Sequence, residues 1–341
     1  MPNIRVMHFG LGPIGAAIVK QVAQRPGFKI VGGIDNDPAM EGRDLGDVVG
    51  FKKRLGVIVS GDAKKAMKAA RPDVVVLCTS SSIKKVLPQI EAILKTRTPI
   101  VSTTEELSYP GYTHIRQARQ IHEWAKKAKV AVLGTGVNPG FAMDALPLFA
   151  TAVCNSVRSV RCERIQDAST RRVPFQRKIG AGLDPATFAQ RAADGSLRHV
   201  GLGESLHLIA QTLGIALDDW HETLEPVLAA RPLECALGKI PAGHAAGVRQ
   251  VAEGLAGGEP RIVLEFQAAI GQRDAHERIV IDGDPPLDLL IQGGVHGDTA
   301  TSAIVINALE PLLASPPGLH TMASIPLVAC RAAPLFAAAR A

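Results

Sequence analysis

Three glycines near the start of the chain have the spacing of a turn that binds phosphate groups. Gly10, Gly12 and Gly15 follow a short apolar run and open a helical pattern. In such a turn the first glycine permits the tight bend, the second lets the backbone approach a pyrophosphate, and the third lets helix and strand pack closely. The N–H groups at the helix N-terminus attract the anion. We therefore predict a dinucleotide site formed by these glycines together with Pro13 and Ile14.

An acidic residue stands where a dinucleotide-binding domain needs one. Asp35 ends the second predicted strand, at the position from which a carboxylate binds the hydroxyls of the adenosine ribose. Since a carboxylate repels a 2′-phosphate, Asp35 favours NAD as the cofactor. Arg43 and the basic run 52–54 lie downstream and could clamp such a phosphate, which leaves NADP as the alternative. Turn glycines with an unrelated surface aspartate are the other interpretation, and the strand–turn–helix context disfavours it.

Two adjacent glutamates follow the fifth predicted strand. Glu105 and Glu106 end the sequence STTEE at residues 102–106. Partial desolvation in a cleft raises the proton affinity of a carboxyl group to an intermediate value. Such a group can accept and donate protons during a reaction. Neighbouring helical residues diverge by about 100°, so only one of the pair can readily face a cleft. The alternative is that both acids occupy the first turn of a helix, where its dipole favours them.

Polar and glycine-rich loops follow the fourth and sixth predicted strands. Hydroxyl groups at residues 79–82 would either hold the cofactor or cap the next helix. The irregular loop 134–144 (GTGVNPGFAMD) would lie near the nicotinamide or form an interdomain turn, and both can hold at once. We assign six residues of the loops after the fourth, fifth and sixth predicted strands to the cofactor site: Thr79, Ser80, Thr104, Gly136, Asn138 and Pro139.

The elements that must position these loops alternate between two kinds. Short β-rich apolar runs occupy residues 4–9, 30–34, 57–59, 74–78, 100–101 and 130–133, with helical patterns at 14–24, 63–70, 83–94 and 115–129. Alternating strands and helices predict βαβ units and a parallel sheet. Right-handed crossovers place every strand C-terminus on one edge of that sheet, so the predicted site residues should meet there.

The pattern changes after residue 140. A helix is expected at 141–153, a strand at 157–165, a polar segment at 166–182, and helices near 185–193 and 204–213. Three strand-like runs at 261–270, 277–282 and 287–292 are joined by short turns, which predicts an antiparallel sheet. Asp298 should cap a helix that extends to residue 313.

The fold class predicted from this pattern is α/β. A Rossmann-type doubly wound parallel sheet at residues 1–140 precedes an α+β domain at 141–300. A C-terminal helix and tail at 301–341 should return to the Rossmann domain.

Composition excludes several other classes of protein. The 341-residue chain carries a net charge of +6, but its basic residues are dispersed, which argues against nucleic acid as a partner. Five cysteines without a CxxC pair favour a reducing, cytoplasmic setting. The first residues are unlike a signal peptide, and no apolar run is long enough for a membrane span. Neither a metal-binding histidine motif nor a GxSxG nucleophile motif occurs, so we expect no metal site.

Several segments together resemble one known family. Residues 134–144 are similar to the dihydrodipicolinate-reductase-like group that includes 2,4-diaminopentanoate dehydrogenase and the native amine dehydrogenases. Further segments of the same resemblance are 102–110 (STTEELSYP), 167–182 (DASTRRVPFQRKIGAG), 199–205 (HVGLGES) and 293–301 (GGVHGDTAT). The segments span nearly the whole chain in the expected order, so the resemblance is fairly specific for the group and less so for one substrate.

This resemblance implies an NAD(P)-dependent oxidoreductase that interconverts an amine with a ketone or aldehyde plus ammonia, working as a homodimer. It implies that residues 141–300 form the substrate and dimerisation domain, and that Glu105 and Glu106 are the candidates for the catalytic residue, of which we favour Glu105. It implies a glutamate that moves protons near the nicotinamide, and the offset of a catalytic lysine in the related homoserine dehydrogenases points to Glu105. It also places the segment with Arg171, Arg172, Gln176 and Lys178 in the substrate cleft. The residues we assign to the substrate are Phe141, Arg172, Gln176 and Thr301.

The chain departs from true dihydrodipicolinate reductases, because it lacks their histidine pair followed by a lysine and their Lys-x-Asp-x-Pro-Ser-Gly-Thr loop. Three alternatives to a general amine dehydrogenase remain open. The enzyme could be specific for 2,4-diaminopentanoate, it could reduce another imine or carbonyl compound, or the chain could be a nicotinamide-sensing regulatory protein without turnover.

Overall fold

The computed structural model describes residues 3–331, and the chain divides into two compact units. The first unit consists of residues 1–141 and 296–341, and the second of residues 142–295. The chain therefore leaves the first unit after Phe141 and returns to it at His296. The end of the predicted C-terminal tail, residues 332–341, lies outside the described residues.

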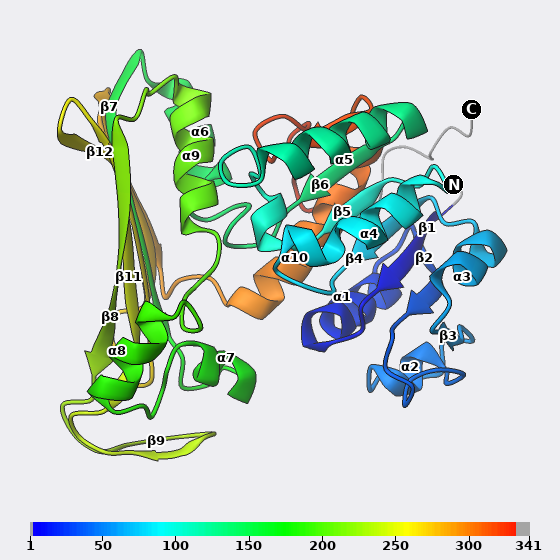
Figure 1. Cartoon of the computed structure of the whole chain (residues 1–341), viewed down its shortest axis with the longest axis horizontal. Coiled ribbons are helices and arrows are strands. Elements are labelled where there is room, and N and C mark those ends of the chain that lie inside the picture. Colours follow the sequence, from blue (N-terminus) through cyan, green and yellow to red (C-terminus); the bar gives the residue numbers. More distant parts are fainter. Residues whose placement is uncertain (1–2, 332–341) are drawn as a thin grey trace. The chain divides into compact units, whose positions relative to one another are not determined.

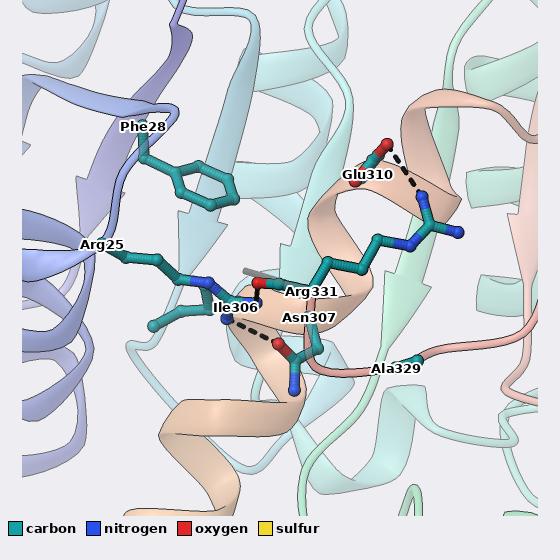
Figure 2. Close-up of a pocket in the computed structure, with 7 residues that line it drawn as sticks. All are labelled: Arg25, Phe28, Ile306, Asn307, Glu310, Ala329 and Arg331. Carbon is teal, nitrogen blue, oxygen red and sulfur yellow. Dashed lines mark hydrogen bonds and ion pairs between the residues drawn. The ribbon is translucent and has the colours of Figure 1, made fainter. Parts of the chain in front are cut away.

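Within the described residues, a seven-stranded sheet forms the centre of the first unit, and every strand pair in it is parallel (Figure 1). From one edge to the other the strands are β3 (Val59–Ser60), β2 (Phe28–Ile34), β1 (Ile4–Phe9), β4 (Val74–Leu77), β5 (Ile100–Ser102), β6 (Ala131–Gly134) and β15 (Gly318–His320). The first six follow the order of the Rossmann fold, which confirms the predicted fold class. The seventh, β15, comes from the C-terminal part of the chain.

Helices cover both faces of this sheet. On one face α1 (Pro13–Gln24) and α10 (Gly297–Leu313) pack against buried valines and isoleucines of the central strands. On the other face lie α3 (Ala63–Ala70), α4 (Ile83–Leu94) and α5 (Ile115–Ala128). The short α2 (Leu45–Val48) packs near the β3 edge. Since the central strands are buried on both sides, they read as continuous apolar runs, which is why the sequence predicts them well.

A histidine is buried within this largely apolar core. His8 on β1 has no hydrogen-bond partner for either ring nitrogen among the described residues. It lies two residues after Val6, so it points to the same face as α1 and α10. Burial lowers the pKa of His8 to about 3. The folded protein therefore holds this imidazole neutral at pH values where an unfolded chain would protonate it.

We expect His8 to make the protein sensitive to mild acid. Between the unfolded pKa of about 6.5 and the folded pKa of about 3, the unfolded chain binds a proton that the folded chain does not. Falling pH therefore favours unfolding, by about 1.4 kcal/mol for each pH unit in this window. Urea unfolding at pH 6 and pH 4.5 measures the free energy of unfolding of the wild type and of His8→Leu. Between these two pH values the free energy of unfolding should fall more in the wild type than in the variant. An equal fall in both proteins would contradict the role of His8 in acid sensitivity.

The second unit is built on a six-stranded sheet, as counted over the part of the chain that the structure describes. In order, its strands are β14 (Leu287–Gln292), β13 (His276–Asp284), β7 (Ser156–Asp167), β12 (Glu259–Ala269), β11 (Ala245–Ala256) and β8 (Asp219–Leu228). A separate hairpin pairs β9 (Leu233–Cys235) with β10 (Gly238–Ile240). The helices are α6 (Ala145–Ala150), α7 (Val173–Lys178), α8 (Pro185–Ala193) and α9 (Leu202–Leu213), with a 3₁₀ turn at Thr151–Val153.

The two faces of this second sheet differ. Helix α9 packs on β11 and β12 while α8 contacts β8, and Figure 1 shows both helices on the same side of the sheet. The opposite face carries charged side chains that form ion pairs, most of them between neighbouring strands. Its ion pairs are Arg161–Glu163, Arg161–Glu265, Arg249–Glu265, Arg249–Glu225, His276–Glu163 and Arg278–Asp288. No helix of the second unit's described residues covers this face, which we call the open face.

The predicted antiparallel arrangement of three C-terminal runs is wrong for the first two of them. The run at 261–270 corresponds to β12 and the run at 277–282 to β13, but β7 lies between them and is parallel to β12. Only β13 and β14 pair as predicted. Short turns favour pairing of consecutive strands, yet β7 fits between β12 and β13 because its alternate residues, such as Val160 and Cys162, are buried.

Two predicted helix boundaries are also wrong. Residues 141–144 form turns, and α6 begins only at Ala145, because the Asp144 side chain accepts a hydrogen bond from the Ala145 N–H and caps the helix there. At the other junction the capping residue of α10 is His296 rather than Asp298. The His296 side chain accepts from the Thr299 N–H, and Asp298 lies in the first turn.

Candidate functional site

The glycine turn has the geometry that its sequence predicts. Gly10 has a φ of +94°, and a Cβ there would lie 2.5 Å from the carbonyl oxygen of Cys78. A Cβ on Gly15 would collide with the carbonyl oxygen of Gly10, so the fold itself requires both glycines. Gly12 differs, since its φ is −59° and nothing lies within 4 Å of a Cβ placed there. Gly12 caps α1, with Pro13 and Ile14 as its first helical residues.

Asp35 connects the glycine turn to the end of β2. One carboxylate oxygen accepts a hydrogen bond from the Leu11 N–H at 2.7 Å, and the other accepts from the Asp37 N–H at 3.0 Å. Each oxygen has a second lone pair, so both can still accept from hydroxyl groups. Asp35 therefore shapes the turn and remains available to a ribose.

A pocket of about 390 Å³ opens beside Asp35 on the carboxyl edge of the sheet. It is lined by Phe9, Gly10, Ile34, Asp35, Asn36, Gly61, Thr79, Ser80, Lys85 and Gln89. The sequence-predicted residues Thr79 and Ser80 are thus beside the predicted ribose acceptor. The Thr79 hydroxyl donates to the Gln89 side-chain oxygen at 2.5 Å, which fixes that amide at the pocket wall.

Two lining residues, Lys85 and Gln89, were missed from the sequence. They lie four residues apart on α4 and therefore share one face of the helix. Their position after the hydroxyl-rich loop 79–82 was the signal that could have found them. The basic residues proposed as a phosphate clamp are not among the lining residues. Arg43 instead donates to the Ala39 carbonyl oxygen, and Arg54 pairs with Asp47.

The two glutamates after β5 lie in a 3₁₀ turn, Glu105–Leu107, and have different surroundings. One side-chain oxygen of Glu106 accepts from the Ile83 N–H at 2.8 Å and lies 3.1 Å from His114 Nε2. Glu106 thus caps the N-terminus of α4, a helix other than the one that the sequence suggested. Glu105 is half-buried beside it. The geometry therefore gives Glu106 a structural task at the start of α4.

Thr104 holds the loops of this edge together. Its hydroxyl donates to the Ser80 carbonyl oxygen at 2.8 Å and accepts from the Ser102 hydroxyl at 2.9 Å. The side chain is buried. Thr104 therefore joins the loop after β5 to the loop after β4, on which Thr79 and Ser80 face the pocket.

The loop after β6 is buried and closely packed. Gly140 has a φ of +124°, and a Cβ there would lie 2.5 Å from the backbone nitrogen of Gly136. Asn138 and Pro139 are buried in the same loop. The Val137 N–H donates to the hydroxyl of Thr301 on α10 at 3.3 Å. Thr301, predicted to contact substrate, thus supports the predicted nicotinamide loop within the first unit.

The predicted substrate residues are divided between the units. Phe141 and Thr301 belong to the first unit, and Arg172 and Gln176 to the second. Arg172 is half-buried and precedes α7. Gln176 has no exposed surface, and its amide donates to the carbonyl oxygens of Ala168 and Ser169 at 3.0 and 3.3 Å. Gln176 therefore supports the loop before α7 from within.

A metal site and a membrane-spanning helix are both absent from the described residues. Over residues 3–331, no three His, Cys, Asp or Glu side chains gather closely enough to hold a metal ion. A membrane-spanning helix is likewise absent from the described residues, since none combines the length and apolar character that a span needs.

Comparisons with known proteins agree with these two units. Residues 4–134 match the family model for the dihydrodipicolinate reductase N-terminus, and residues 141–337 match that for the 2,4-diaminopentanoate dehydrogenase C-terminal domain. A 2,4-diaminopentanoate dehydrogenase of Acetoanaerobium sticklandii is 29% identical over 335 residues, which cover 96% of this chain and 94% of that protein. An amine dehydrogenase of Streptomyces virginiae is 26% identical over 95% of this chain and 96% of its own length.

A solved structure shares the fold over almost the whole chain. The amine dehydrogenase from Mycobacterium smegmatis superposes with a TM-score of 0.85 at 22% identity, covering 97% of this chain and 98% of that one. Because the C-terminal family model covers more than half of the chain, the protein belongs to the 2,4-diaminopentanoate dehydrogenase family.

Proposed function

We propose that this protein is a nicotinamide-dependent amine dehydrogenase. Oxidation would convert an amine, water and the oxidised cofactor into a ketone or aldehyde, ammonia, the reduced cofactor and a proton. The observation that carries the proposal is the similarity of both units, over nearly their full length, to a 2,4-diaminopentanoate dehydrogenase and an amine dehydrogenase. Both names describe removal of hydride from a carbon that bears nitrogen.

The first unit fits a dinucleotide in two respects. The space beside Gly12 is open where a pyrophosphate would approach, and the 390 Å³ pocket holds the Asp35 carboxylate for a ribose. When bound, the nicotinamide supplies the hydride acceptor. The contribution of the chain is to orient the cofactor and the amine and to move protons.

In this proposal Glu105 is the residue that moves protons. Amine oxidation requires a proton to leave nitrogen and a water molecule to add to the imine carbon. A carboxylate within hydrogen-bond reach can accept the first proton and, after releasing it to solvent, can accept a second proton from the attacking water. In the reverse direction the same carboxyl group would help ammonia to form the imine. Arg172 is our proposed contact for the substrate, either attracting a carboxylate or disfavouring a second ammonium group.

We further propose NAD rather than NADP as the preferred cofactor. The pocket wall beside the predicted ribose position carries Asp35, and neither Arg43 nor the run 52–54 lines that pocket. A 2′-phosphate would meet the carboxylate without compensation from those basic residues.

Replacing Asp35 with asparagine tests this preference. Asparagine keeps an oxygen that can accept from the Leu11 N–H, so the turn should persist while the charge is lost. Hydrogen bonds to a charged group contribute about 1.5–3 kcal/mol, and we therefore expect NAD binding to weaken about tenfold or more while the gap to NADP narrows. Fluorescence titration with NADH and NADPH measures both. A wild-type protein that strongly prefers NADPH would contradict the role of Asp35.

The most direct test of the function is an activity panel. Purified protein is mixed with NAD or NADP and with monoamines, diamines and diamino acids including 2,4-diaminopentanoate, and the absorbance of the reduced cofactor is followed. Turnover of any of these amines supports the proposal, and the pattern separates a general amine dehydrogenase from a diamino-acid enzyme. Tight NADH binding without turnover on any amine or on ketones with ammonia would favour the nicotinamide-sensing alternative.

We also propose that the protein is a homodimer whose second copy covers the open face. Val251, Val263 and Ile165 are more than nine-tenths buried beneath the ion pairs of that face, so it is not purely a charged surface. Sheets with one uncovered face commonly gain their cover by self-association. Light scattering at micromolar concentration should give about twice the chain mass of 35.9 kDa. A mass equal to one chain would exclude the dimer.

A further inference from the structure

A chain of buried polar side chains crosses the core side of the second unit. Arg164 and Gln166 lie on β7, Glu277 on the neighbouring β13, and Arg171 in the loop that follows β7. Their exposed fractions range only from 2% to 7%. Burying charged groups in this way is costly unless their geometry is well satisfied, and it seldom adds stability compared with an apolar core. We therefore look for a role of this network other than the stability of the fold.

The network holds one backbone residue by both of its polar groups. The Val295 carbonyl oxygen accepts from Gln166 Nε2 at 2.9 Å and from Arg164 Nη2 at 3.2 Å. The Val295 N–H donates to Glu277 Oε1 at 3.2 Å, and Arg164 Nη1 donates to the same carboxylate oxygen. Val295 is the last residue of the second unit, and α10 begins two residues later. The network thus fixes the point at which the chain leaves this unit.

Gln166 extends the network to the predicted substrate segment. While its amide N–H donates to Val295, its side-chain oxygen accepts from Arg171 Nη1 at 3.2 Å. The Arg171 guanidinium also lies 3.9 Å from the centre of the Phe175 ring on α7. Arg171 therefore spans from β7 to α7, and Arg172, the residue that precedes α7, follows it directly.

Further hydrogen bonds hold the backbone of the loop between β7 and α7. Asp167 accepts from the Ser169 N–H and from the Gly271 N–H, and Gln176 supports the same loop by its amide. Loops held in this manner present their side chains in one orientation, which is what substrate recognition requires. Within it, the Gln166–Arg171 contact connects the loop with the exit of the chain at Val295.

We propose that Gln166 is a positioning residue for substrate recognition. By accepting from Arg171 and donating to Val295 it holds the 167–172 loop, and with it Arg172, in a fixed position relative to Val295 within the second unit. Gln166 itself does not touch the substrate in this proposal. The inference rests on the proposed function, because it takes this loop to face the amine.

The test is Gln166→Leu, which keeps the approximate size of the side chain and removes both hydrogen bonds. We expect the KM for the amine to rise about tenfold or more, since a hydrogen bond to a charged group is lost. The Kd for NADH should change less than twofold, because the first unit is untouched. An unchanged amine KM in a folded, active variant would overturn the proposal.

Gln250→Leu is the matched control. Gln250 is also a fully buried glutamine facing the core side of this sheet, and it also holds backbone, bonding both the N–H and the carbonyl oxygen of His199. It has no bond to Arg171 or Val295 among the described contacts. We expect Gln250→Leu to lower the melting temperature while the amine KM stays within twofold. An equal rise in KM for both variants would mean that general loosening of the sheet, rather than Gln166, is responsible.

A conservative variant covers the case in which Gln166→Leu does not fold. Gln166→Glu keeps an acceptor for Arg171, but it replaces the donor to Val295 with a carboxylate oxygen that faces the Val295 carbonyl oxygen, so the amine KM should again rise. A folded Gln166→Glu variant with the amine KM of the wild type would overturn the proposal. Failure of the proposed function is recognised separately, because the wild type would then bind NADH but turn over no amine.

Discussion

Replacing Glu105 with glutamine should lower the turnover number for amine oxidation by a factor of about 10² to 10⁴, the usual contribution of acid–base catalysis. Glutamine preserves the size of the side chain and its capacity for hydrogen bonds, but it cannot accept a proton. Glu105 is half-buried in the 3₁₀ turn that follows β5, at the carboxyl edge of the sheet. NADH binding should change little, because neither the glycine turn nor the 390 Å³ pocket contains Glu105.

Glu106→Gln is the control that separates the two neighbouring acids. In the wild type a Glu106 carboxylate oxygen accepts from the Ile83 N–H and lies beside His114. Loss of the Glu106 charge should therefore affect the stability of α4 more than the rate of the reaction. Glutamine still offers an acceptor to Ile83, and the destabilisation should therefore stay within the 0.5–2 kcal/mol that removal of a cap costs, to an order of magnitude. Steady-state kinetics and thermal unfolding of both variants distinguish these effects.

Two results would overturn the assignment. If Glu105→Gln keeps its activity while Glu106→Gln is inactive, the roles of the neighbours are exchanged. If both variants remain active, neither glutamate moves the essential proton, and the amine-dehydrogenase proposal loses its main chemical support.

Local patterns were sufficient to predict most of the first unit. Its central strands are buried on both faces, so runs such as 74–78 read as continuous apolar segments, and most of them are followed by a helix of regular periodicity. The glycine turn and Asp35 lie within that alternation, and their positions follow directly from it. Strand β15 was not predicted, because only three residues form it and its pairing with β6 is a contact distant in sequence.

The second unit was harder to predict because its order depends on long-range pairing. Strands β8 and β11 were missed since Pro226, Gly247 and several alanines give them a weak strand preference, which pairing with each other and with β12 outweighs. The insertion of β7 between β12 and β13 likewise leaves no local trace in the sequence.

Individual side chains of the candidate site show the same limit. The sequence offered Glu105 and Glu106 as near-equivalent residues, and the difference between them arises from Ile83 and His114, on segments that the pattern does not connect with them. The Gln166 network depends on Val295, more than a hundred residues away in sequence. Residue type and spacing identify the kind of chemistry, whereas contacts across the fold decide which residue is available for it.

The glycine turn provides the second large effect. Gly12→Thr should leave the fold intact and weaken NADH binding about 10- to 100-fold. The φ of −59° and ψ of −177° at this residue are allowed to any amino acid, and no atom lies within 4 Å of the added Cβ. Threonine also ranks with glycine as a helix N-cap, so α1 should form normally.

The loss of affinity should come entirely from the bound state. The side chain would occupy the space through which the turn approaches the pyrophosphate, and overfilling a closely packed contact costs about 1–3 kcal/mol. Fluorescence titration with NADH measures the affinity, and thermal unfolding without cofactor measures the fold. An unchanged NADH affinity would mean that the pyrophosphate does not pass beside Gly12.

Gly15→Ala is the informative contrast, because it adds a smaller group at a position where the fold has no room. Its Cβ would collide with the Gly10 carbonyl oxygen, so the melting temperature of the cofactor-free protein should fall. The NADH affinities and melting temperatures of the two variants should therefore show that the two glycines have different roles. Gly12 is required by the ligand and tolerated by the fold, whereas Gly15 is required by the packing of α1 on β1 before any ligand binds. If Gly12→Thr also lowers the melting temperature as much as Gly15→Ala, the space beside Gly12 is not kept open for a cofactor.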